Sequence, residues 1–375
     1  MPPLAQRNLF HDKVRLSVTL TGIVFAVVLI VVQVGLFVGF TSTTSGLIDH
    51  SGADLWIGSK HIPYLEQSAA FSERKFYQVL ATPGVAHAEK FIAYWSQWKR
   101  PDGGKESVLI VGFNPDSDLG RPWNLVVGKP EDVKLADTII ADKIYFKKLG
   151  ITGRLGETVE IRGRRARLVG ITEGIRSFTT SPLVFTSFKN AQDYVPMAED
   201  RTNFILVKAA PGVDLGALKR EIARRVQDVD IYTTTEFSGR TRFYWMFTTG
   251  AGVAVLLAAM LGLVVGVVIV AQTIYATTMD HIREFGTLKA IGASNRYIYR
   301  VILKQAVISA VIGYALAMMV SVFVVRGSRE GGAAILLPWE LAFGMFWLTL
   351  AMCIGAAFVS INKVTRIDPA MVFKG

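Results

Sequence analysis

The sequence predicts an α-helical membrane protein with four transmembrane helices, arranged one plus three, and a mixed α/β extracytoplasmic domain between the first and second helices. Three observations indicate this class. Hydrophobic residues make up 51% of the 375 residues, four long runs carry no charged side chain, and Lys and Arg gather in short segments beside those runs. A helix needs about 20 mostly apolar residues to cross the hydrocarbon core of a bilayer, and each run is long enough.

The apolar runs give the positions of the spans. The first run follows basic residues, as the apolar part of a signal peptide does, but that part is usually only about 7–15 residues long. We therefore interpret the first run as an uncleaved anchor. The expected spans are residues 17–40, 246–271, 301–325 and 340–362.

The placement of charge predicts the orientation. Basic residues outnumber acidic ones in residues 1–16, 272–300 and 363–375. By the positive-inside rule these segments are cytoplasmic, which leaves residues 41–242 and the loop 326–339 outside. The segment 1–16 is either an amphipathic helix on the membrane surface or a frayed tail. The net charge of +11 then reflects membrane orientation. We do not expect nucleic-acid binding, because no basic cluster is interleaved with aromatic residues.

The extracytoplasmic segment shows both helical and strand-like patterns. Alternating, β-branched runs predict strands at 89–99, 106–113, 157–163, 165–172 and 203–209. A hairpin is expected to turn near Gly163. Helices are expected at 72–82 and 214–227, the second with Asp214 as its N-cap.

The chain lacks the sequence signatures of common catalytic sites. It contains no phosphate-binding G-x-x-x-x-G-K-[ST], no H-E-x-x-H and no G-x-S-x-G motif. The five histidines show no ligand spacing, and the single cysteine, Cys353, excludes an intrachain disulfide. We therefore expect no catalytic residues, no metal site and no cofactor bound by this chain.

Small residues recur along two of the spans. In the second span they are four residues apart, a spacing that allows a neighbouring backbone to approach closely. We expect tight helix packing there, with a dimer interface as one candidate, although chance is an alternative. The polar residue Gln33 makes either an interhelical hydrogen bond or a substrate contact. The small residues are Gly250, Ala254, Ala258, Gly262 and Gly266 in the second span, and Gly35 and Gly39 in the first.

A short amphipathic stretch, residues 280–294, joins the second and third spans. Ile282, Phe285, Leu288 and Ile291 are three residues apart and fall near one helical face. Gly292 is suited to end this helix and Ser294 to cap the next one. The helix either lies in the interface with its apolar face in lipid or docks into a groove of a cytosolic partner.

Several stretches resemble the MacB/FtsX permease superfamily, the type VII ABC transporters. The coupling-helix signature of that superfamily is similar to "REFGTLKAIGAS". Its entry into the first span is similar to "LAQRNLFHDKVRLSVTLTGIVFA", and its carboxyl end to "RIDPAMVFKG". Its extracytoplasmic domain resembles "ADKIYFKKLGITGRLGETVEIRGRRARLVGI". Within the superfamily, "IDHSGADLWIG" and "GIRSFTTSPLVFTS" look most like the DevC group.

The resemblance implies a permease subunit of an ABC exporter in the bacterial inner membrane, with its large domain in the periplasm. Unlike MacB, this chain has no fused nucleotide-binding domain, so a separate cytosolic ATPase would use ATP and Mg²⁺. Its expected contacts on this chain are Ile282, Arg283, Glu284, Phe285, Gly286, Leu288, Lys289, Ile291 and Gly292.

The resemblance also implies further partners and a substrate class. The partners are a second copy of the chain, a periplasmic adaptor of the membrane fusion protein class, a TolC-like outer-membrane channel and membrane lipid. The expected substrate is lipid-like or amphiphilic. The alternative function is an FtsX-like transmembrane transmitter that regulates periplasmic enzymes without transport.

Overall fold

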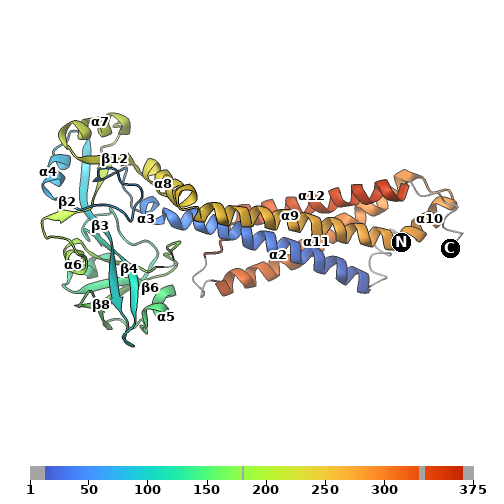
Figure 1. Cartoon of the computed structure of the whole chain (residues 1–375), viewed down its shortest axis with the longest axis horizontal. Helices are drawn as coiled ribbons and strands as arrows, with labels where there is room; N and C mark the ends of the chain where they lie inside the picture. The colour runs from blue at the N-terminus through green and yellow to red at the C-terminus, as the bar shows by residue number, and fades with distance from the viewer. Residues whose placement is uncertain (1–12, 180, 329–333, 366–375) are drawn as a thin grey trace. The chain divides into compact units, whose positions relative to one another are not determined.

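The computed structural model describes residues 13–179, 181–328 and 334–365, which form two compact units (Figure 1). One unit holds the long apolar helices, and the other holds an α/β domain built from residues 39–252. Three parts of our predictions lie partly outside the described residues. They are the cytoplasmic segments 1–16 and 363–375 and the loop 326–339, of which residues 1–12, 366–375 and 329–333 are not described.

Four helices are long and apolar enough to cross a membrane, as the sequence predicted. The first has 32 residues, which corresponds to about 48 Å at the rise of an α-helix and exceeds the ~30 Å hydrocarbon core. The helix therefore continues beyond the apolar layer. The four are α2 (Lys13–Thr44), α9 (Ala251–Asp280), α11 (Asn295–Ser328) and α12 (Trp339–Thr365).

The regular helix of the second span begins later than residue 246, the start that we predicted for the span. Tyr244–Thr248 forms a π-helix, η3, and Gly250 has a φ of +74°, so α9 begins only at Ala251. The uncharged run continues through this interruption, which is why the absence of charge alone did not reveal it.

The helices of the membrane unit share one apolar core. The described members with almost no exposed surface come from α2, α9, α11, α12 and the short helix α10 (Ile282–Ala290). They include Ile23, Ile30, Val270, Phe285, Ile302, Ala310, Cys353 and Ala357.

The α/β domain is organised around a ten-stranded mixed sheet. Its order is β12-β1-β11-β3-β4-β9-β6-β8-β5, with β7 pairing β3 and β8. Two pairs, β4–β9 and β6–β8, are parallel, and the other pairs are antiparallel. The strands are β1 (Leu55–Ser59), β3 (Val85–Lys99), β4 (Lys105–Phe113), β5 (Leu125–Val127), β6 (Thr138–Asp142), β7 (Thr158–Ile161), β8 (Arg164–Thr172), β9 (Leu183–Ser187), β11 (Phe204–Ala209) and β12 (Val229–Thr233), with β2 (Phe71–Ser72) and β10 (Arg201–Thr202) forming a separate pair.

Short helices complete this domain and cover the sheet. In β1, Leu55 and Ile57 enter one apolar core together with helix α7 (Leu215–Arg225). Trp56 enters another core together with Phe237 of helix α8 (Thr234–Phe243). This alternation is the two-residue period of a strand that is buried on both faces. The helices are α3 (Gly46–Asp49), α4 (Arg74–Leu80), α5 (Phe146–Leu149), α6 (Phe188–Tyr194), α7 (Leu215–Arg225) and α8 (Thr234–Phe243), with 3₁₀ turns η1 (Pro130–Lys134) and η2 (Lys143–Tyr145).

All strands and helices predicted within this domain are present. The β7–β8 hairpin turns at Arg162 and Gly163, whose φ values of 49° and 75° fit a type I′ turn. Asp214 caps α7, because its Oδ2 accepts the Ala217 N–H at 2.8 Å.

Candidate functional site

The short helix α10 follows α9 after a single residue, His281, and is closed at its other end by a glycine. The Ala293 N–H donates to the Leu288 carbonyl at 2.9 Å, and the Gly292 N–H donates to the Lys289 carbonyl at 3.0 Å. Gly292 has a φ of +98°, so the pair of bonds forms the Schellman closure that glycine favours.

The next helix starts immediately after this closure. The Ser294 Oγ accepts the Tyr297 N–H at 3.3 Å and so caps α11. At the other end of α10, His281 Nδ1 lies 2.9 Å from Glu284 Oε1. Both connections of α10 are thus short and defined by hydrogen bonds.

One side of α10 is buried within the membrane unit. Phe285 is only 1% exposed and belongs to the same core as Ile274 and Ile298. Gly286 is buried, and Leu288 packs partly against this core. Phe285 and Gly286 thus attach α10 to its own helix bundle, and our expectation that they meet a partner groove stays a prediction. The three-residue spacing identified an apolar face but not which body covers it.

The opposite side of α10 is open. Ile291 is 79% exposed, and Arg283, Glu284, Thr287 and Gly292 are exposed as well. We call these five residues the α10 outer surface. Ile282 and Lys289 are half-buried between the two sides. The α10 outer surface combines one large apolar side chain with charges of both signs.

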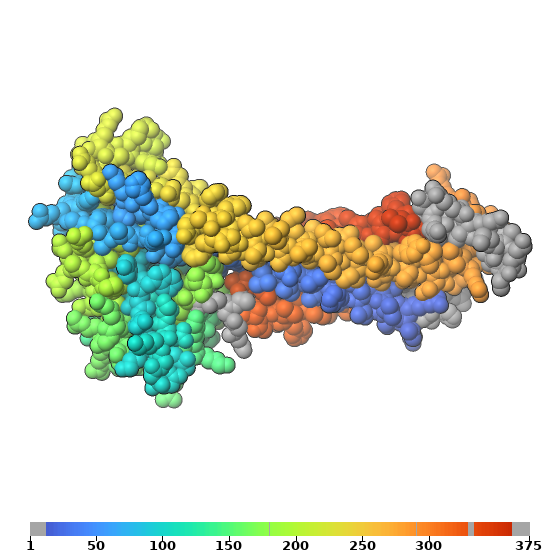
Figure 2. Space-filling view, in the orientation of Figure 1, coloured from blue at the N-terminus to red at the C-terminus, as the bar shows by residue number. Residues whose placement is uncertain are grey.

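The end of α9 that leads into α10 is fixed to α2. Thr19 Oγ1 and Thr277 Oγ1 are hydrogen-bonded at 2.8 Å, and Arg15 Nε lies 3.9 Å from Asp280 Oδ2. Figure 2 shows the two helices side by side, α2 in blue and α9 in golden yellow. A displacement of α10 would therefore act on both helices.

Two glycines of α9 allow this close approach. A Cβ atom on Gly266 would lie 2.7 Å from Ile30 Cδ1, and one on Gly262 would lie 2.9 Å from Gln33 Cγ. The Gln33 side chain thus packs on Gly262 with its aliphatic part.

The other small residues of the predicted ridge do not share this contact. Ala254 is exposed, Ala258 is half-buried and Gly250 precedes the helix. The buried side of α9 instead runs through Ala259, Gly262, Gly266 and Val270. A face of an α-helix advances by three and four residues in alternation, so a repeat of four alone drifts away from it.

Gly35 and Gly39 of α2 pack against backbone rather than another helix. The Leu336 N–H donates to the Gly35 carbonyl at 3.1 Å. A Cβ atom on Gly35 would lie 2.8 Å from the Leu336 carbonyl oxygen, and a Cβ atom on Gly39 would overlap the Ala334 carbonyl oxygen. Sequence reasoning missed this contact because the segment before α12 carries no motif.

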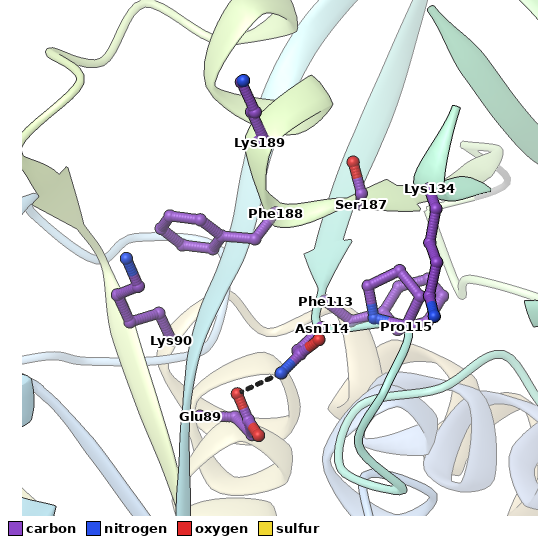
Figure 3. Close-up of a pocket in the computed structure, with 9 residues that line it drawn as sticks. All are labelled: Glu89, Lys90, Phe113, Asn114, Pro115, Lys134, Ser187, Phe188 and Lys189. Atoms are coloured by element: carbon purple, nitrogen blue, oxygen red, sulfur yellow. Dashed lines mark hydrogen bonds between the residues drawn. The ribbon is translucent and has the colours of Figure 1, made fainter. Parts of the chain in front are cut away.

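The α/β domain contains a pocket of about 310 Å³ at the carboxyl ends of the parallel strands β4 and β9 (Figure 3). Several of its polar groups are engaged within the domain. Lys90 Nζ lies 2.7 Å from Glu73 Oε2 and 4.7 Å from the centre of the Phe188 ring. Lys134 pairs with Asp116. The lining residues are Glu89, Lys90, Phe113, Asn114, Pro115, Lys134, Ser187, Phe188 and Lys189. A charged ligand would have to compete with these pairs.

No group of three His, Cys, Asp or Glu side chains within residues 13–179, 181–328 and 334–365 is arranged to hold a metal ion.

Comparison with known proteins gives matches to both units. Residues 16–225 match the MacB-like periplasmic core domain, and residues 256–369 match the FtsX-like permease C-terminal domain. The uncharacterized ABC transporter permease Rv0072 of Mycobacterium tuberculosis is 25% identical over 385 residues, which cover 99% of each chain. The uncharacterized ABC transporter permease YknZ of Bacillus subtilis is 23% identical over 256 residues, 62% of this chain and 59% of that one.

Among solved structures, the periplasmic region of MacB from Actinobacillus actinomycetemcomitans is similar, with a TM-score of 0.39 and 13% identity. The match covers 50% of this chain and 92% of that one.

Proposed function

This chain belongs to the MacB/FtsX-like family of ABC transporter permeases, and we propose that it transmits ATP-driven motion from a separate cytosolic ATPase to its α/β domain. Membership implies an ATPase partner and a non-catalytic role for the chain itself. ATP and Mg²⁺ would be used by the partner.

The observation that carries this proposal is the construction of α10. Phe285 fixes one side of the helix in the bundle core, while Ile291 on the other side is 79% exposed. Such a helix is held firmly by its own chain and still presents to a partner a surface that carries an apolar side chain together with Arg283 and Glu284. We infer that the partner ATPase binds the α10 outer surface.

The mechanism follows from how α10 is connected. Movement of the ATPase would displace α10, and the short closures at His281 and Gly292 would pass that movement to α9 and α11. Because Thr19 and Thr277 bond α2 to α9, the first span would move with the second. The α/β domain, which lies between these two spans in the sequence, would then receive the motion.

We further propose the setting in which this motion is used. The chain would pair with a second copy in the bacterial inner membrane, with the α/β domain in the periplasm. A periplasmic adaptor and a TolC-like channel would complete a DevC-like export system for a lipid-like or amphiphilic substrate. The scarcity of charged groups in the four spans supports substrate handling outside the membrane.

The docking claim is tested with Ile291→Asp in nanodiscs. We expect Ile291→Asp to weaken binding of the partner ATPase by at least tenfold while the membrane unit stays folded. The matched control is Leu155→Asp, which changes an exposed leucine of the α/β domain. Unchanged ATPase affinity and unchanged ATPase stimulation in Ile291→Asp would mean that α10 is a lipid-facing element, and the proposal would fail.

A further inference from the structure

Five aromatic rings gather within the α/β domain next to the point where the chain enters α9. The ring centres of Tyr64 and Tyr244 are 4.1 Å apart, and those of Phe178 and Trp245 are 4.4 Å apart. Tyr64 also meets Trp245, and Phe40 meets Phe178 edge-on. We call these residues the Trp245 cluster. The cluster joins the end of α2, the loop after β1, the loop before β9 and η3.

The backbone at this cluster departs from a regular helix. Tyr244 and Trp245 belong to the π-helix η3, which continues α8 and is followed by Gly250 with its positive φ. Single π-turns are rare and are found frequently at functional sites. The chain therefore enters α9 through a turn whose geometry depends on the side chains packed around it.

Four polar atoms at or near this turn are sealed from solvent and have no hydrogen-bond partner in the part of the chain that the structure describes. They are Glu66 Oε2, Trp245 Nε1, Ser238 Oγ and Thr241 Oγ1. The last three residues are three and four positions apart, so they follow one side of α8 and η3. Buried polar atoms without partners are uncommon in folded proteins, and each calls for an explanation.

Glu66 is the only carboxylic acid among these four residues, and its surroundings disfavour its charge. Burial raises the pKa of the Glu66 carboxyl to about 7. The backbone N–H of Glu66 and the nearby Trp245 indole N–H, which is not in hydrogen-bonding geometry with the carboxylate, act weakly in the opposite direction. The neighbouring tyrosines cannot neutralise a Glu66 carboxylate, because a tyrosine side chain is never positively charged. The pKa of Tyr64 is itself raised, by burial first and then by Tyr244 and Glu66.

The arginines of α8 are engaged elsewhere. Arg240 Nε donates to the Ile62 carbonyl at 2.8 Å, and Arg242 Nη2 donates to Asp49 Oδ2 at 2.7 Å. The groups around Glu66 are thus aromatic rings, an indole N–H and a loop backbone. An ionised Glu66 would remain a buried charge without a cationic partner among the residues that the structure describes.

We propose that Glu66 is a proton-operated latch: with a neutral carboxyl the Trp245 cluster is closed, and loss of the proton opens the cluster and loosens the turn into α9. Opening lets the carboxylate reach water, which is the favourable environment for its charge. The proposal does not depend on the ATPase or on the transported substrate.

The direction of the pH effect follows from the pKa. The closed cluster binds the proton more tightly than an open one, because the pKa is raised from the ordinary 4.5 to about 7. The ratio of closed to open clusters is therefore greatest below the ordinary pKa. It falls by up to about tenfold per pH unit as the pH rises toward 7, and then becomes constant after a total fall of about 300-fold.

The test uses the full chain in nanodiscs with 5-fluorotryptophan, followed by ¹⁹F NMR between about pH 4 and pH 8.5. The Trp245 resonance is assigned by its loss in Trp245→Phe. We expect it to shift with a midpoint between about pH 5 and pH 7, to become independent of pH in Glu66→Gln, and to titrate unchanged in Glu199→Gln, which alters an exposed carboxylate of the same domain. Unchanged resonances of the core residues Trp56 and Trp98 would show that the variant is folded.

A second measurement needs no variant. Hydrogen exchange of residues 240–250 in the wild-type chain, corrected for the intrinsic effect of pH, should lose protection between about pH 5 and pH 7. A Trp245 resonance that keeps titrating in folded Glu66→Gln would overturn the latch. So would protection of residues 240–250 that does not change with pH.

Discussion

Replacing Phe285 by alanine separates two ways in which α10 could use its largest side chain. The structure buries Phe285 to 1% exposure in the core of the membrane unit. Removing a fully buried phenylalanine side chain typically costs about 3–5 kcal/mol, since contacts are lost and a cavity remains. We therefore expect Phe285→Ala to weaken the attachment of α10 to its bundle.

The destabilisation by Phe285→Ala can be expressed as a change in the equilibrium between attached and detached α10. A loss of about 3 kcal/mol raises the population of detached α10 by about 100-fold. Ile291→Ala serves as the matched control, because its side chain is 79% exposed and surface substitutions usually change stability by less than about 0.5 kcal/mol. The two variants remove apolar side chains from opposite sides of the same helix.

The assay is hydrogen exchange of residues 282–290 in nanodiscs, combined with the affinity of the partner ATPase. Phe285→Ala should lose protection in this segment, whereas Ile291→Ala should keep it and lose ATPase affinity. The reasoning would be refuted if Phe285→Ala kept full protection and lost only ATPase affinity. In that case Phe285 would serve the partner rather than the bundle.

Three other changes test the membrane unit and its orientation. Gly266→Leu should destabilise the membrane unit in SDS unfolding by about 1–3 kcal/mol, because a Cβ atom at this position would already lie 2.7 Å from Ile30 Cδ1. The control Val265→Leu, at an exposed neighbouring position, should leave the unfolding unchanged. Thr277→Val should cost about 0.6 kcal/mol through the lost bond to Thr19, a coupling that a double-mutant cycle measures directly. A single cysteine at Ser294 should react only with reagents that reach the cytoplasm, and labelling from the periplasmic side would reverse the predicted topology.

Features set by neighbours in the chain could be predicted well from the sequence. Uncharged runs gave the four spans because the bilayer selects for length and apolarity. Gly292 and Ser294 were identified because a helix end is decided within a few residues. The same holds for Asp214, whose side chain caps the helix that begins beside it.

Features that depend on distant parts of the chain could not be predicted in this way. The burial of Phe285 requires knowing that the bundle lies against α10, which spacing does not reveal. Strands β1 and β12 pair with each other although about 170 residues separate them, and neither was predicted. The break before α9 was hidden because Tyr244–Thr248, like residues 251–279 that follow, carries no charged residue.

The register of α2 and α9 also limits how these helices can move. Their contacts pair Arg15 with Asp280, Thr19 with Thr277 and Ile30 with Gly266, which is one antiparallel alignment along most of the shared length. Sliding one helix by a turn of about 5.4 Å would separate every pair at once. The two helices are therefore suited to tilting together as one rigid pair. For the same reason, one residue inserted into α9 after Gly266 would rotate the rest of that helix by about 100° and turn Thr277 and Asp280 away from α2. Such an insertion would leave the hydropathy of the span nearly unchanged and would still disconnect α10 from the first helix.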